Sequence, residues 1–391
     1  MPVVSIVKGP RSPSERQIYR MVYKAVKLVG GVESIIEPGD RVLVKPNLVT
    51  SVPEEITDPR VIKAVILLVE KANPGEVILG EGSLAGVDTE DVFSETGVRR
   101  IAEEMGVKLV DLKKAELVEV DVPGGEIFKK IRVPRIVIEC DVAVNVPVLK
   151  THVHTLLTLG LKNMKGVFPE RERRIMHFTD INKGIADYVT VVKPDLTIVD
   201  AIVGLEGLGP HSDTGRPREI DMIVAGKDVV AVDAVCAKIV GVDPEEVLHI
   251  KYAARRGLGE IDLGRMEIRG ERIEDVAIKD FEIPPPSLGA LSPLPNVKIV
   301  DGSPCSACVW ILPKVFKLLE SDLKKIEKLT ILVGPKARPP AEGEEGLIFV
   351  GNCLKGFGKE EGYVRGCPPF TGDVVERVRR LLVSHDESAT R

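Results

Sequence analysis

Apolar, β-branched segments alternate with helical patterns through residues 1–240, and this alternation restricts the fold more than any other feature. Several of these segments are apolar without a polar alternation, which is typical of strands buried on both faces. A helix should begin where Asp58 can cap it and Pro59 fits its first turn. The alternation predicts an α/β fold with a mostly parallel, doubly wound sheet between two layers of helices. The expected strands are 3–7, 41–45, 76–80, 108–111, 141–146, 195–199 and 221–225.

Two segments interrupt the alternation. Residues 118–133 contain two short strand patterns around Gly124 and Gly125, which predicts a hairpin added to the sheet. Residues 283–295 are rich in proline, which favours a semi-rigid linker without a regular element. We therefore expect an α/β domain over residues 1–282, the linker over 283–295, and a smaller α/β domain that carries cysteines over 296–391.

Composition and charge exclude several classes of protein. The net charge of −5 argues against nucleic acid as a partner. No apolar run is long enough for a membrane span and no signal peptide opens the chain, so we expect a cytoplasmic protein without a membrane partner. Gln17 is the single glutamine among many lysines, arginines and glutamates, a composition typical of a thermophile.

The last hundred residues hold four cysteines, each at a turn: Cys305, Cys308, Cys353 and Cys367. Four converging thiolates suit a four-iron (4Fe-4S) cluster or a tetrahedral zinc ion. Structural zinc usually uses two close pairs, whereas 13 residues separate the second pair here, so we favour the cluster and keep zinc as the alternative. A pair of disulfides and a redox-active dithiol at Cys305 and Cys308 stay open. Cys140 and Cys236 lie in apolar surroundings and are expected in the core.

Residues 150–177 form a locally basic segment in an acidic chain, with six lysines and arginines against two glutamates. The segment follows an expected strand, and ligands of open α/β sheets bind at the carboxyl ends of strands. Ammonium and amide groups there suit a ligand with a phosphate or a carboxylate, and the phosphate of a flavin or deazaflavin is one example. A solvated basic loop is the alternative, and a metal on the histidines lacks a third ligand. The candidate binding residues are Lys45, Asn47, Lys150, His154, Lys162, Asn163 and Lys165.

Candidates for acid–base chemistry follow the strands as well. They are Glu81, His152, Asp200 and Glu206. Loops after parallel strands should meet at one edge of the sheet, which would bring these groups together with the binding residues. No pair of them is fixed by spacing alone.

Four strings resemble a prokaryotic family called "domain of unknown function 362", and they occur in the family's order over roughly residues 3–263. They are VKPNL (44–48), NVPVLKTH (145–152), LGLKNMKG (159–166) and IVDAIVGLEG (198–207). Members of this family are commonly described as iron–sulfur proteins, and many carry a ferredoxin-type run of closely spaced cysteines. The cysteines here are dispersed, so the resemblance implies at most one cluster.

These observations predict an iron–sulfur oxidoreductase in which one 4Fe-4S cluster exchanges electrons with an anionic cofactor or substrate in the α/β domain. A redox partner protein and a second copy of the chain are the protein partners that we consider. One alternative is a non-redox enzyme acting on a phosphorylated or carboxylated metabolite, with a structural zinc. The other is a binding or metallochaperone module.

Overall fold

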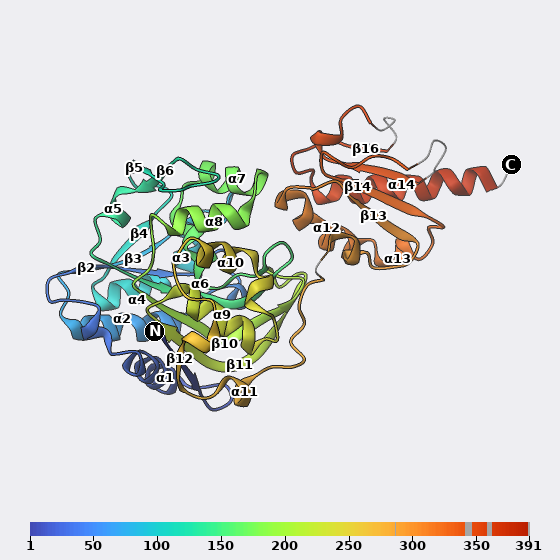
Figure 1. Cartoon of the computed structure of the whole chain (residues 1–391). Coiled ribbons are helices and arrows are strands. Elements are labelled where there is room, and N and C mark those ends of the chain that lie inside the picture. Colours follow the sequence, from blue (N-terminus) through green and yellow to red (C-terminus); the bar gives the residue numbers. More distant parts are fainter. Residues whose placement is uncertain (286, 341–345, 358–361, 390–391) are drawn as a thin grey trace. The chain divides into compact units, whose positions relative to one another are not determined.

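The computed structural model describes residues 1–285, 287–340, 346–357 and 362–389 of the chain. It consists of two compact units, each with its own sheet (Figure 1). The α/β unit comprises Met1–Met176 and Asp180–Ile283, and the cysteine unit comprises His177–Thr179 and Pro284–Arg391. The predicted fold class is confirmed: the architecture is α/β with a mostly parallel central sheet.

The central sheet of the α/β unit has the strand order β12-β1-β11-β10-β7-β2-β3-β4. The run from β10 to β4 is parallel, whereas β11 is antiparallel to both of its neighbours. The strands are β1 (Val3–Lys8), β2 (Arg41–Pro46), β3 (Glu76–Glu81), β4 (Lys108–Asp111), β7 (Val142–Val146), β10 (Leu196–Gly207), β11 (Gly215–Gly226) and β12 (Glu267–Gly270). Two further strands lie off this path: β8 (Val148–His152) pairs with β10, and β9 (Leu156–Leu157) pairs with β8.

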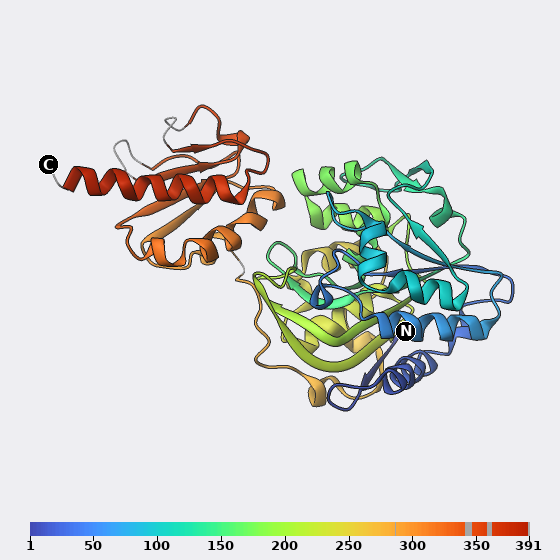
Figure 2. The ribbon, with the colours of Figure 1, turned by 180° about the vertical axis from the view of Figure 1, so that it is seen from behind.

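Helices cover both faces of this sheet, as the two opposite views show (Figure 1, Figure 2). Successive side chains of a strand point to opposite faces, so Val42 and Val44 of β2 pack in one apolar cluster and Leu43 packs in the other. The first cluster includes α1 (Glu15–Leu28), α2 (Pro59–Val69), α3 (Thr89–Glu95) and α4 (Val98–Met105). The second includes α6 (Leu159–Asn163), α7 (Glu170–Phe178), α8 (Ile181–Val189), α9 (Val229–Ile239) and α10 (Leu248–Arg255). Two shorter helices are α5 (Arg135–Ile138) and α11 (Ile273–Val276).

Strand β1 lies between β12, which forms one edge of the sheet, and β11. It pairs with β11 in antiparallel register, Val4 opposite Gly226, and with β12 in parallel register, Val3 opposite Glu267. The first three strands in the order, β12, β1 and β11, are therefore contributed by opposite ends of the sequence of the α/β unit.

The predicted hairpin forms, but the expectation that it joins the main sheet is wrong. Strands β5 (Leu117–Asp121) and β6 (Lys130–Pro134) pair with each other as a separate two-stranded sheet. Half-buried side chains alternate along β5, which suits a ribbon lying on the surface rather than a strand buried on both faces.

The cysteine unit contains a parallel sheet of the order β13-β14-β15-β16. Its strands are β13 (Val297–Asp301), β14 (Leu329–Val333), β15 (Leu347–Val350) and β16 (Tyr363–Val364), and its helices are α12 (Ser306–Leu318), α13 (Glu320–Leu323) and α14 (Thr371–Ala389). The expected linker is not wholly irregular, because Leu288–Leu291 forms a short 3-10 helix. Leu288 and Leu291 are buried there, so part of the proline-rich stretch packs within this unit.

None of the helices among the described residues combines the length and apolarity that a membrane crossing requires.

Candidate anion site and cysteine cluster

A buried ion pair joins the carboxyl ends of β2 and β3. The Lys45 ammonium lies 2.9 Å from Glu81 Oε2, and both side chains are at most 2% exposed. The Glu81 carboxylate also accepts hydrogen bonds from the backbone amides of Leu48 (2.8 Å) and Gly82 (2.7 Å). Burial lowers the pKa of Lys45, an effect that the Glu81 charge opposes. One carboxylate therefore fixes two loops at the carboxyl edge of the sheet.

A second buried lysine extends this network but lacks a carboxylate partner. Lys150 Nζ donates to Asn47 Oδ1 (2.8 Å) and to the backbone oxygen of Glu55 (2.7 Å), which are both neutral acceptors. Asn47 Nδ2 donates to Asn163 Oδ1 (2.8 Å), and Asn163 Nδ2 donates to Asn145 Oδ1 (2.8 Å). Burial lowers the pKa of Lys150 to about 8. The structure thus brings Lys45, Asn47, Glu81, Lys150 and Asn163 into one connected group.

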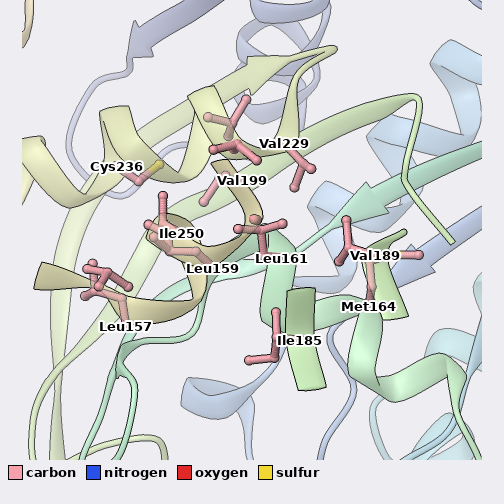
Figure 3. Close-up of a cluster of buried hydrophobic side chains, with 14 of the residues drawn as sticks. Leu157, Leu159, Leu161, Met164, Ile185, Val189, Val199, Val229, Cys236 and Ile250 are labelled. Carbon is pink, nitrogen blue, oxygen red and sulfur yellow. The ribbon is translucent and has the colours of Figure 1, made fainter. Parts of the chain in front are cut away.

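The segment that carries Lys162, Asn163 and Lys165 is held in place by apolar packing and by hydrogen bonds to Asp233. Leu159, Leu161 and Met164 point into the apolar cluster under α6 (Figure 3). The carboxylate of Asp233 on α9 accepts from the amides of Gly160 and Leu161, each at 2.8 Å. Because those two anchors hold α6 and the following 3-10 helix η4 (Met164–Val167), Lys162 and Lys165 are left half-buried.

These two lysines add positive charge to an already cationic group. Burial, helped by the Lys150 charge, lowers the pKa of Lys162 to about 7. Burial and the charges of Lys162 and Arg173 hold the pKa of Lys165 well below its usual value. The Arg173 guanidinium is itself buried and donates to the backbone oxygens of Ser83 (2.8 Å) and Gly166 (2.7 Å). Glu81, which is already paired with Lys45, acts on Lys45, Lys150 and Arg173, and Glu55, which is bonded to His211, acts on Lys150. The charges recorded as acting on Lys162 and Lys165 are those of other cations.

The two predicted histidines lie beside this group. His152 is buried, and its Nδ1 accepts from the backbone amide of His154 at 3.1 Å. The His154 side chain is half-buried. Burial lowers the pKa of His154; Asp180 opposes this and the Lys162 charge adds to it. The imidazole of His154 is thus close enough to Lys162 to respond to its charge.

The remaining two acids are engaged elsewhere. Asp200 on β10 is buried beside the start of α2, where it accepts from the amides of Asp58 (2.7 Å) and Ile202 (2.9 Å). Burial and the Asp58 charge raise the pKa of Asp200 to about 7. Glu206 lies farther along β10 and forms ion pairs with Arg216 (2.7 Å) and Arg218 (3.6 Å) of β11. Among the described contacts, none joins Glu206 to the lysine group.

Sequence reasoning missed three polar side chains near the site. Glu55 contacts His211 Nδ1 at 2.8 Å; burial raises the pKa of Glu55, but the His211 hydrogen bond and charge lower it to about 2. His249 on α10 is fully buried, and neither of its ring nitrogens has a hydrogen-bond partner among the described residues. Burial lowers the pKa of His249 to about 3, and the Lys162 charge contributes. No local pattern marks these residues, since their neighbours come from distant parts of the chain.

The four C-terminal cysteines lie at the carboxyl edge of the second sheet. Cys305 caps α12 after β13, Cys308 lies in the first turn of α12, Cys353 follows β15 and Cys367 follows β16. Cys305 Sγ accepts from the Cys308 thiol and from the amides of Ala307 and Cys308, and together these lower the pKa of Cys305 to about 6. The same pairing raises the pKa of Cys308.

Gly351 lies between two of these thiols. A Cβ atom at this position would be 3.4 Å from Cys308 Sγ and 3.8 Å from Cys353 Sγ. Its φ of +98° also favours glycine. The charges of Cys305 and Cys367 act on both Cys308 and Cys353, so the four thiols are neighbours.

Within the described part of the chain, no three His, Cys, Asp or Glu side chains are arranged to hold a single metal ion.

Cys140 and Cys236 belong to the α/β unit and not to the cysteine unit. Cys236 is fully buried in α9, and the half-buried Cys140 donates to the backbone oxygen of Ile136 at 3.0 Å.

The chain is similar to two proteins that have been described. It is 31% identical over 239 residues to the "Thylakoid-associated protein sll1697" of Synechocystis, covering 59% of this chain and 72% of that protein. The solved structure of the lactate racemase apoprotein from Thermoanaerobacterium thermosaccharolyticum is 14% identical with a TM-score of 0.39. That match covers 61% of this chain and 62% of the racemase chain, so the present chain spans less than two thirds of it.

The model of a protein family described as "Domain of unknown function (DUF362)" matches residues 42–238, which run from β2 into α9 and include Lys45, Lys150, Lys162, Lys165 and Arg173. This chain belongs to the DUF362 family.

Proposed function

We propose that the protein is an oxidoreductase whose α/β unit binds an anionic small molecule and whose cysteine unit holds one 4Fe-4S cluster. The observation that carries the first part is the surplus of buried positive charge. Among the described contacts, Lys150 and Lys162 form no ion pair with a carboxylate; Glu81 is already paired with Lys45, and Glu55, whose charge also acts on Lys150, is bonded to His211.

An anion would offset this charge. A buried cation without a counter-ion is costly, whereas a charge-assisted hydrogen bond to a phosphate or carboxylate contributes roughly 1.5–3 kcal/mol. The group also lies at the carboxyl ends of β2 and β3, the usual binding edge of an open α/β sheet. A phosphate-bearing flavin or deazaflavin and a carboxylated metabolite both have the chemistry that this edge would recognise.

The cluster proposal is supported by the chemistry of the four thiols. A 4Fe-4S cluster binds each cysteine through a different iron, so its ligands stand farther apart than those of one ion. Cys305, Cys308, Cys353 and Cys367 would be the ligands, and the cluster would supply one-electron transfer. Backbone amides already donate to the sulfurs, as Gly334 does to Cys353, which suits thiolate ligands.

The anion site is tested by thermal shift with inorganic phosphate, flavin mononucleotide and acetate. Wild type should be stabilised by at least one of them, and Lys150→Met should lose that response. Lys238→Met is the matched control, because Lys238 is an exposed lysine of the same unit. An equal response in all three proteins, or none in wild type, would contradict the anion site.

The cluster is tested on protein purified without oxygen. We expect iron and sulfide in equal amounts and a broad absorbance near about 400 nm that dithionite bleaches. Cys353→Ser should lower the iron content sharply, and Cys140→Ser should not. Zinc in place of iron would instead support a non-redox enzyme with a structural metal.

A further inference from the structure

Lys162 differs from the other lysines of the site. Lys45 is paired with Glu81, and Lys150 donates to two oxygens. No hydrogen bond or ion pair recorded for the described residues includes the Lys162 ammonium, although its side chain is half-buried. The contacts recorded for the described residues therefore leave this amine unheld by another side chain.

Burial and the charge of Lys150 disfavour the charged form of Lys162. Lys150 on β8 acts on it directly, and Lys165 on η4, His154 after β8 and His249 on α10 respond to its charge. None of these four is a carboxylate. Burial next to other cations lowers the pKa of Lys162 to about 7, so a large share of the amine is neutral at physiological pH. A neutral lysine amine is a nucleophile toward carbonyl carbon.

Two imidazoles without recorded partners lie beside this amine. His249 is fully buried, with both ring nitrogens unpaired, and the next residue, Ile250, fixes α10 in the apolar cluster (Figure 3). The side chain of His154 takes part in no hydrogen bond recorded for the described residues. Burying an unpaired polar group is unfavourable, so a role for these imidazoles would explain why they are here. Neutral imidazole both accepts and donates protons.

We propose that Lys162 forms an imine with the carbonyl group of a small oxo acid whose carboxylate is held by Lys150 and Lys165. This inference rests on the anion site proposed above. Lys162 Nζ attacks the carbonyl carbon, a carbon–nitrogen bond forms, and the carbonyl oxygen leaves as water with the two protons of the amine. His154, whose imidazole responds to the Lys162 charge, moves those protons from nitrogen to oxygen. No electrons are transferred, and no further reactant is required.

The imine is tested by reductive trapping. The full chain is incubated with glyoxylate or pyruvate and cyanoborohydride, which converts an imine into a stable secondary amine, and the modified peptides are mapped by mass spectrometry. We expect one adduct, at Lys162, formed at least about tenfold faster than any adduct at Lys238, an exposed lysine. Lys162→Arg should abolish it, Lys238→Arg should not, and phosphate or acetate should slow it by competition.

The result separates this inference from the function on which it rests. Stabilisation by phosphate or acetate without trapping at Lys162 would overturn the imine and leave the anion site in place. Adducts spread over surface lysines at equal rates would also overturn it. If Lys162→Arg does not fold, the peptide map of the wild-type protein decides alone, because it compares lysines within one chain.

Discussion

Removing the Glu81 charge while Lys45 stays in place should destabilise the α/β unit by about 3–5 kcal/mol. The two side chains are 2% and 0% exposed, and 2.9 Å separates their charged atoms. Glu81→Gln keeps the shape but replaces one carboxylate oxygen with an amide that cannot accept. It therefore leaves the Lys45 ammonium buried without a counter-charge and breaks a backbone hydrogen bond to Leu48 or Gly82.

The size of the ion-pair contribution follows from a double-mutant cycle. Lys45→Met alone should also be costly, whereas Lys45→Met with Glu81→Gln should cost less than the sum, with a coupling of about 1–3 kcal/mol. Urea unfolding followed by circular dichroism measures all three variants. Glu219→Gln is the control, because it breaks the Arg11–Glu219 pair of similar length, 3.0 Å, at the exposed surface. If Glu81→Gln costs no more than this control, or if the coupling is zero, the buried pair does not hold the two loops.

Three further outcomes are expected. The pKa of Lys162 is about 7 in the folded chain and about 10.4 when unfolded, so between these pH values the unfolded state binds one more proton than the folded state. The thermal midpoint should therefore rise with pH over this range, and Lys162→Met should reduce that rise. Asp187 is fully buried, accepts three backbone amides and pairs with Arg256; Asp187→Asn should cost about 3–5 kcal/mol in urea and speed hydrogen exchange at residues 126–128. Gly351→Ala should reduce iron uptake more than Gly356→Ala, since both have positive φ but only at Gly351 would the added Cβ contact two cysteine sulfurs.

The parallel part of the fold could be predicted because its strands can be recognised from the residues of each strand alone. Residues 41–45, 76–80 and 108–111 are apolar runs bounded by turns, and they form β2, β3 and β4 as expected. The antiparallel half could not be predicted, since nothing in residues 3–7 names a partner more than 200 residues away in β11. The short strands β15 and β16 were not expected either, because few residues carry their pattern.

The same distinction applies to the site. Lys45 and Glu81 lie at the carboxyl ends of parallel strands and Asn47 follows one of them, and parallel strands bring such residues to one edge. Glu206 has a similar local pattern, yet β10 continues through it and pairs it with Arg216, so an acid after a predicted strand end became part of a longer hairpin. His249 illustrates the opposite case. Its position beside Lys162 depends on how α10 packs against α6, which a single sequence does not record.

The position of β1 between β11 and β12 has a consequence for synthesis on the ribosome. Strand β1 leaves the exit tunnel before both of its sheet neighbours, β11 and β12, and β12 ends at Gly270. Until then the parallel strands β2, β3, β4 and β7 can assemble, while the backbone groups on both edges of β1 remain without strand partners. Such long-range pairing slows folding. Deleting the first eight residues would leave a gap between β11 and β12 rather than shorten an end of the sheet.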